Sequence, residues 1–204
     1  MIVRGLGELA IRGRVLLFCT LLGMLFGLSW GSLANESALP HIGPAPQFTL
    51  TDQDGRPFSL GKHKGKVAVV TFVFAGCSDT CPLLTAKLVG IQRKLARAAP
   101  ELIFTAITVD PLNDTPAMLK EYATRYSANL VNFAFLTGSP NQIEEVAHRY
   151  AVFRKKQDNG NTDHSFLTSL IDRQGTLRVQ YLGAKFDPQE FEADLRSLLA
   201  EGAK

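Results

Sequence analysis

The sequence predicts an α/β protein in which helices cover both faces of a mixed β-sheet, preceded by an amino-terminal apolar segment. The run 66–74 is almost wholly apolar, and both it and the run 101–110 are rich in β-branched residues, as in strands that are buried on both faces. Between strand-like runs, apolar residues recur at helical spacing. Strands and helices that alternate in this way form layered α/β folds.

The amino-terminal segment, residues 1–34, contains a charge-free apolar run over residues 15–34. Basic residues precede the run, and the small residues Ser32 and Ala34 near its end suit cleavage of a secretory signal. A run of about 20 apolar residues is also long enough to cross a bilayer. We therefore expect a signal peptide or an uncleaved membrane anchor, and in both cases an exported domain.

Residues 35–46 are rich in proline, glycine and serine and are expected to form a linker. The domain itself would then comprise residues 47–204. Its first part, 47–60, is typical of two short strands around an Asp-Gly turn, and the buried strand 66–74 follows.

The later elements have start signals that suit helices. Pro82 fits the first turn of a helix, and Thr115 and Ser139 are expected N-caps because a proline follows each of them. Residues 154–163 are polar and turn-rich, and predict an exposed loop or an irregular hairpin. The expected elements are helices over 82–99, 114–126, 139–152 and 187–202, strands over 101–110 and 132–138, and a hairpin of strands over 165–172 and 176–183.

The composition is that of an ordinary globular domain. The chain has 204 residues, 46% of them hydrophobic and 20% charged, which allows one domain with a sizeable core. The net charge of +3 is too small to indicate a nucleic-acid-binding protein. Function must therefore be sought in individual motifs.

Two of the three cysteines, Cys77 and Cys81, lie where the strand 66–74 passes into the next helix. This is the carboxyl edge of the sheet, where α/β folds place their sites, and a helix start favours thiolates. A disulfide between the two residues would close only a small loop and stabilise the fold little. The pair can instead act in redox chemistry or bind a soft metal ion, which would need a third ligand.

The histidines are the candidates for that third ligand. His41, His63 and His148 are expected at the surface, in the linker, in a lysine-rich turn and on the polar side of a helix. His164 differs because it ends the polar loop and precedes a buried strand whose start could lie beside the cysteines. A histidine that enters a strand and bonds a backbone carbonyl fits the same context.

Three motifs in order and in register give the chain a specific resemblance. They are "FVFAGCSDTCP" at 72–82, "TVDPLNDTP" at 108–116 and "DHSFLTSLID" at 163–172. With them the chain resembles the Sco/SenC family of thioredoxin-fold copper proteins over about residues 40–200.

The resemblance implies a thioredoxin-like fold and one copper site formed by Cys77, Cys81 and His164, in which Cys77 and Cys81 are also a redox pair. It implies that the protein delivers copper to the binuclear copper site of cytochrome c oxidase, reduces the cysteines of that site, or does both. The implied partners are the copper-site subunit, a thiol reductant protein and the membrane if the anchor is kept. The implied location is the periplasmic side of the cytoplasmic membrane.

Three carboxylates near these motifs have two interpretations each. Asp110 and Asp114 suggest a metal or acid–base role, but a turn and a helix cap are the favoured interpretation. Asp163 is either a partner that orients His164 or a solvated loop residue.

The main alternative function is a metal-independent thiol–disulfide oxidoreductase in the exported compartment, which would make the chain an enzyme. Against it, three residues rather than the two of thioredoxins separate the cysteines, and a redox enzyme does not need His164. A thiol peroxidase is disfavoured because Phe74 stands where that class has a threonine. A plain interaction module with an inert disulfide is the third alternative.

Overall fold

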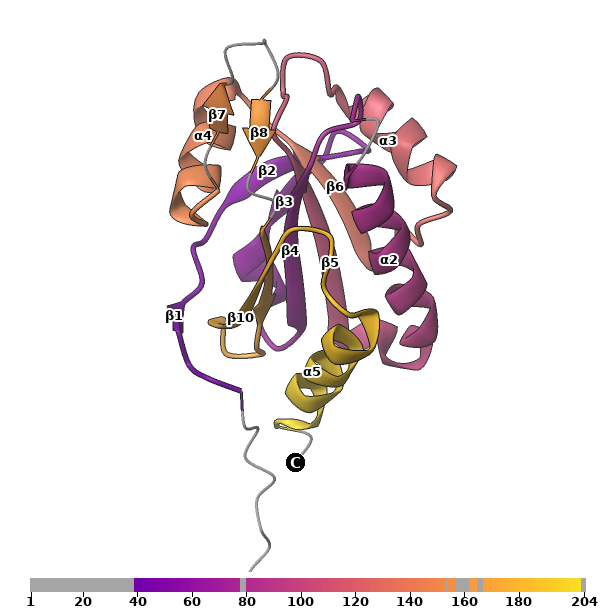
Figure 1. The fold of residues 1–204 in the computed structure, drawn as a ribbon, viewed down its shortest axis with the longest axis vertical. Coiled ribbons are helices and arrows are strands. Elements are labelled where there is room, and N and C mark those ends of the chain that lie inside the picture. The colour runs from indigo at the N-terminus through magenta and orange to yellow at the C-terminus, as the bar shows by residue number, and fades with distance from the viewer. Residues whose placement is uncertain (1–38, 78–79, 153, 157–161, 165–166, 203–204) are drawn as a thin grey trace, which may run out of the picture. The chain divides into compact units, whose positions relative to one another are not determined.

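The structure, a computed structural model, describes residues 39–77, 80–152, 154–156, 162–164 and 167–202 (Figure 1). The expected signal or anchor, 1–34, lies outside the described residues. Within the described residues, no helix is both long and apolar enough to cross a membrane.

The order of elements follows the predicted alternation of strands and helices. The strands are β1 (Gly43–Pro44), β2 (Thr49–Asp52), β3 (Pro57–Ser59), β4 (Val67–Val73), β5 (Leu102–Thr108), β6 (Phe133–Thr137), β7 (Arg154–Lys156), β8 (Thr162–His164), β9 (Leu167–Ile171) and β10 (Thr176–Leu182). The α-helices are α2 (Thr80–Lys94), α3 (Pro116–Arg125), α4 (Pro140–Arg149) and α5 (Pro188–Ala200), and two short 3₁₀ helices are η1 (Leu60–His63) and η2 (Ala96–Glu101).

Eight of the described strands form one mixed sheet in the order β1-β10-β9-β4-β5-β6-β2-β3. Strands β4, β5 and β6 are parallel, whereas β9 and β10 form an antiparallel hairpin beside β4. Strands β7 and β8 pair separately, so the irregular hairpin expected over 154–163 is confirmed. The predicted mixed sheet is confirmed as well.

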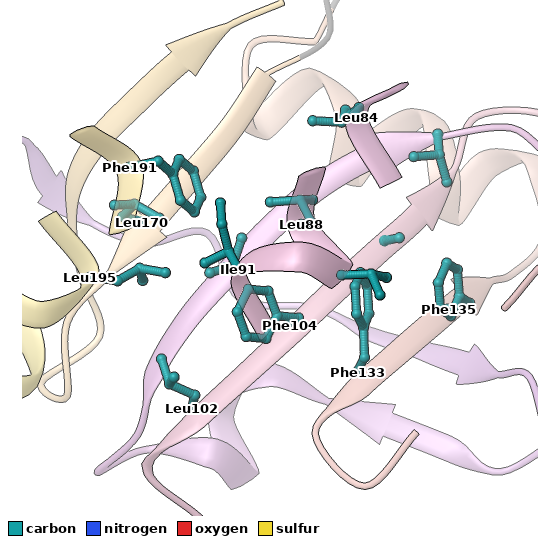
Figure 2. Packing of buried hydrophobic residues seen from close by; sticks show 14 of the residues in the cluster. Leu84, Leu88, Ile91, Leu102, Phe104, Phe133, Phe135, Leu170, Phe191 and Leu195 are labelled. Atoms are coloured by element: carbon teal, nitrogen blue, oxygen red, sulfur yellow. The ribbon is translucent and has the colours of Figure 1, made fainter. Parts of the chain in front are cut away.

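The central strand β4 is buried on both faces, as its sequence predicts. Its residues alternate between two cores: Val67 and Val69 pack with helices α2, α3 and α5, whereas Ala68 and Val70 pack with α4. Figure 2 shows the first of these cores, where leucines of α2 lie over phenylalanines of β5 and β6. Residues 37–204 form a compact unit, and the buried residues of both cores lie within it.

The predicted helix starts are confirmed at two positions. The hydroxyl of Thr115 accepts a hydrogen bond from the backbone N–H of Met118 at 3.3 Å, and Ser139 caps α4. The end of the helix expected over 82–99 was predicted too late: α2 ends at Lys94, and the 3₁₀ helix η2 follows it. Pro100 lies inside η2 and disfavours the α-helical conformation at the residue before it, so the last residues of the expected helix do not suit an α-helix.

Part of the expected linker 35–46 belongs to the fold. Strand β1 pairs with β10, and the buried guanidinium of Arg178 donates to the backbone carbonyls of Leu39 and Pro40, at 2.8 Å each. A strand of two residues has no hydrophobic period, so the sequence pattern could not predict it. The domain therefore begins at least as early as Leu39.

Candidate metal centre

The two cysteines lie together at the carboxyl end of β4, as predicted. After Val73 the chain turns, with the N–H of Cys77 donating to the carbonyl of Phe74 at 3.2 Å. Cys81 is the second residue of α2, and its N–H donates to the Sγ of Cys77 at 3.4 Å. The sulfur of Cys77 thus takes the place of a capping acceptor at the helix start. Both thiols are free, Cys77 being half-buried and Cys81 fully buried.

Burial dominates the electrostatics of the second thiol. It raises the pKa of Cys81 far above its ordinary value, and the hydrogen bond and charge of Cys77 and the charge of Asp114 act in the same direction. The helix start would favour a thiolate, but for Cys81 the loss of hydration outweighs it. Burial therefore makes this thiol less readily ionised than an ordinary cysteine, and metal binding has to displace its proton.

Asp114 supports the cysteine loop from outside it. Its side chain is 3% exposed, and its Oδ2 accepts hydrogen bonds from the backbone N–H of Ala75, at 2.9 Å, and from the hydroxyl of Thr108. Burial raises the pKa of this carboxyl group. The predicted helix cap is the neighbouring Thr115. Asp114 instead holds the loop that leads to Cys77, because it accepts the hydrogen bond from Ala75.

Asp110 has the structural role that the sequence favoured. It lies in the turn after β5, where its Oδ2 accepts a hydrogen bond from the Nδ2 of Asn113 at 2.9 Å. Its own N–H donates to the hydroxyl of Thr108. Asp110 and Asp114 therefore hold turns rather than face each other across a site.

Replacing Asp114 with alanine is expected to lower the free energy of unfolding by about 2 kcal/mol, because two buried donors lose their acceptor. Asp114→Asn keeps an acceptor oxygen and removes the buried charge, so it should cost much less. Urea denaturation of both variants at neutral pH measures the difference. Equal losses in the two variants would mean that the hydrogen bonds to Ala75 and Thr108 do not hold the loop.

His164 is the last residue of β8, and its side chain lies outside the described part of the structure. The backbone register locates the strand that follows it. Strand β9 begins at Leu167 and runs antiparallel to β4, with Thr168 opposite Thr71. The start of β9 therefore lies at the end of β4 that leads into Cys77. Asp163 is in β8 opposite Lys155, and its side chain is likewise outside the described residues.

The other histidines do not join the cysteines. His41 and His148 are exposed, as expected, and His63 stacks on Phe58 with ring centroids 4.7 Å apart. Burial lowers the pKa of His63, which lies before β4, at the opposite end of the strand from the cysteines. Among the side chains that the structure describes, no three histidine, cysteine, aspartate or glutamate residues form a metal-binding group.

The two thiols are part of a ligand set that suits a soft metal ion. The sulfur of Cys77 lies 3.4 Å from the backbone nitrogen of Cys81, so the two thiols are close enough to bind one ion, and thiolates select soft ions such as Cu(I). Two sulfurs are an incomplete ligand set, and His164, the third ligand predicted from the sequence, precedes the strand β9 whose start lies at this end of β4.

Comparison with known proteins gives a consistent family. The family model described as SCO1/SenC matches residues 38–200. The chain is 33% identical over 146 residues to a SCO1 protein homolog of Bacillus subtilis, covering 70% of this chain and 76% of the relative. It is 33% identical over 152 residues to the mitochondrial protein SCO2 of Saccharomyces cerevisiae, covering 70% of this chain and 48% of that relative.

Solved structures agree with this family. BsSco, whose structure is described as that of a member of the Sco family of cytochrome c oxidase assembly proteins with a disulfide switch, is 30% identical, with a TM-score of 0.69 over 81% of this chain and 99% of that chain. ScoI of Bradyrhizobium japonicum, solved with copper bound, is 31% identical, with a TM-score of 0.65 over 76% of this chain and 99% of that chain. The predicted thioredoxin-like fold is thereby confirmed.

Proposed function

This chain belongs to the SCO1/SenC family, and we propose that it binds copper and serves in the assembly of cytochrome c oxidase. The observation that carries the proposal is the pair of free thiols, one before the start of α2 and one in its first turn, at the edge of the sheet where β9 begins. The copper-bound ScoI structure and the assembly role of BsSco support it from related proteins.

Cys77, Cys81 and His164 are the proposed copper ligands. Two thiolates suit Cu(I), and an added imidazole lets the same site hold Cu(II). The Cys81 thiol is fully buried, and copper binding would displace its proton, which is released to solvent. Copper here is cargo, so the site has to release the ion as well as bind it.

The recipient we propose is the binuclear copper site of cytochrome c oxidase, which the protein supplies with copper, reduces, or both. In the reducing role, Cys77 and Cys81 form a disulfide and give two electrons and two protons to a disulfide of the recipient. Bound copper and a Cys77–Cys81 disulfide exclude each other. After each reducing step, a separate thiol protein would therefore have to reduce the Cys77–Cys81 disulfide before copper could bind again.

A metal-independent thiol–disulfide oxidoreductase remains the second candidate, and one observation favours it. Cys77 is half-buried and its sulfur accepts the N–H of Cys81, whereas Cys81 is fully buried. This is the arrangement of an attacking thiol and a resolving thiol. In either function we propose an exported domain on the periplasmic side of the cytoplasmic membrane.

A transfer experiment separates the two functions. The copper-loaded domain, residues 37–204, is mixed without oxygen with an equimolar amount of the soluble copper-site domain of the oxidase subunit, reduced beforehand. We expect copper to be found on the recipient once the two proteins are separated, with Cys77→Ser as the inactive control. Reduction of an oxidised recipient by the copper-free domain, without any copper transfer to the reduced one, would contradict the chaperone role.

A further inference from the structure

A lysine-rich turn lies at the end of the sheet opposite to the cysteines. The sequence "GKHKGK", residues 61–66, runs directly into the start of β4, whereas the cysteine loop follows the end of the same strand. Because β4 has 7 residues at about 3.3 Å each, the two features are separated by about 23 Å along the strand. The turn is therefore too far from the cysteines to serve the copper site directly.

The lysines of this turn carry uncompensated charge. Lys62 and Lys64 are exposed and Lys66 is half-buried. None of the ion pairs found among the described residues includes any of the three. Lys64 and Lys66 line a shallow hollow together with Asp172 and Gly175 of the β9–β10 turn. The turn thus presents three ammonium groups on one side of the domain.

The acidic residues around this turn already have cationic partners. Arg173 donates to the carbonyl of Gly65 at 2.9 Å, which places it against the turn, and it pairs with Glu101. Asp172 and Glu201 both pair with the buried guanidinium of Arg178, Asp172 at 3.1 Å. Around the turn, three carboxylates therefore stand against two arginines and three lysines, which leaves a local excess of two positive charges.

The described chain begins at the same end of the domain (Figure 1). Arg178 holds the carbonyls of Leu39 and Pro40, and the N–H of Ala45 donates to the carbonyl of Gly175 at 2.9 Å. The side chain of Lys64 passes close to Gly175. The first residues of the domain are therefore bound to the hairpin that adjoins the lysine turn.

Only a short stretch of chain connects the apolar run to the first described residue, Leu39. The charge-free run ends at Ala34, and the five residue steps to Leu39 can span at most about 18 Å when fully extended. If that run is kept as a membrane anchor, one of the two forms expected from the sequence, the lysine end of the domain could not move far from the bilayer. Positive groups are attracted to anionic headgroups over about a Debye length, roughly 8 Å at physiological salt.

We propose that Lys62, Lys64 and Lys66 form a membrane-facing surface that binds the anionic headgroups of a lipid bilayer. The charge complementarity and the short tether both favour a bilayer over any other anionic partner. The binding would turn the cysteine end of β4 away from the membrane, toward partners in the exported compartment. The proposal concerns surface charge alone, so it can hold or fail independently of copper binding.

Sedimentation with lipid vesicles tests the proposal on residues 37–204, which contain both cores and lack the apolar run. Vesicles of equal parts phosphatidylglycerol and phosphatidylcholine are compared with vesicles of phosphatidylcholine alone. We expect binding only to the anionic vesicles, weakened by added salt. Each lysine near a charged bilayer contributes about a fivefold preference, so Lys62→Gln with Lys64→Gln should weaken binding about 30-fold.

The matched control is Arg56→Gln with Lys120→Gln, which lowers the net charge equally but removes cations that pair with Asp54. It should bind anionic vesicles nearly as well as the wild type. Both lysines of the test variant are exposed, so its thermal unfolding should be unchanged. Absence of binding to anionic vesicles, or equal loss in the two double variants, would overturn the proposal.

Discussion

Replacing Cys77 or Cys81 with serine is expected to abolish stable copper binding. A serine hydroxyl is a harder ligand than a thiolate and ionises far less readily, so one soft ligand would remain. The affinity for Cu(I) should fall by more than about 100-fold, because changing only the groups that surround metal ligands already costs about 10- to 100-fold. Anaerobic competition with a Cu(I) chelator measures the loss.

The full chain offers a control with the same substitution. Cys19 lies in the apolar run, so Cys19→Ser should leave the copper affinity unchanged. Cys77→Ser gives the decisive result, because Cys77 is half-buried whereas a serine at the buried Cys81 position also disturbs the core. A variant of either cysteine that stays folded and keeps its copper would mean that the metal binds elsewhere.

Replacing His164 with alanine is expected to remove Cu(II) binding and to leave Cu(I) binding and disulfide formation. The two thiolates remain as soft ligands for Cu(I), but Cu(II) loses the imidazole that suits it. We expect a loss of about 100-fold or more in Cu(II) affinity, measured by competition with a Cu(II) chelator. His41→Ala, which removes an exposed histidine, should have no effect. Unchanged Cu(II) affinity in His164→Ala would exclude this residue as a ligand.

Most of the fold could be predicted from the sequence because its signals are local. The apolar, β-branched run of β4 and the caps at Thr115 and Ser139 each depend on neighbouring residues alone. Strand β1 could not be predicted, since it exists only through its pairing with β10 far along the chain. The end of α2 at Lys94 could not be predicted either, since the same segment continues as the 3₁₀ helix η2 and the apolar spacing does not separate the two.

For the candidate site, the sequence predicts where the two cysteines lie but not the contacts that surround them. The position of Cys77 and Cys81 follows from the strand-to-helix order, which the sequence reveals. Two properties come from tertiary contacts that spacing does not show. One is the raised pKa of Cys81, which burial causes. The other is the hydrogen bond that the backbone N–H of Ala75 donates to Asp114, a residue 39 positions later in the sequence.

The most direct test of the proposed copper site is a spectroscopic one. The reduced domain, residues 37–204, receives an equimolar amount of Cu(II) without oxygen, and visible and EPR spectra are recorded for the wild type and for His164→Ala. We predict a strong thiolate-to-copper charge-transfer band in the wild type that is lost in the variant. A wild type without this band, with Cys77 and Cys81 simply oxidised to a disulfide, would contradict the copper site and favour the metal-independent oxidoreductase.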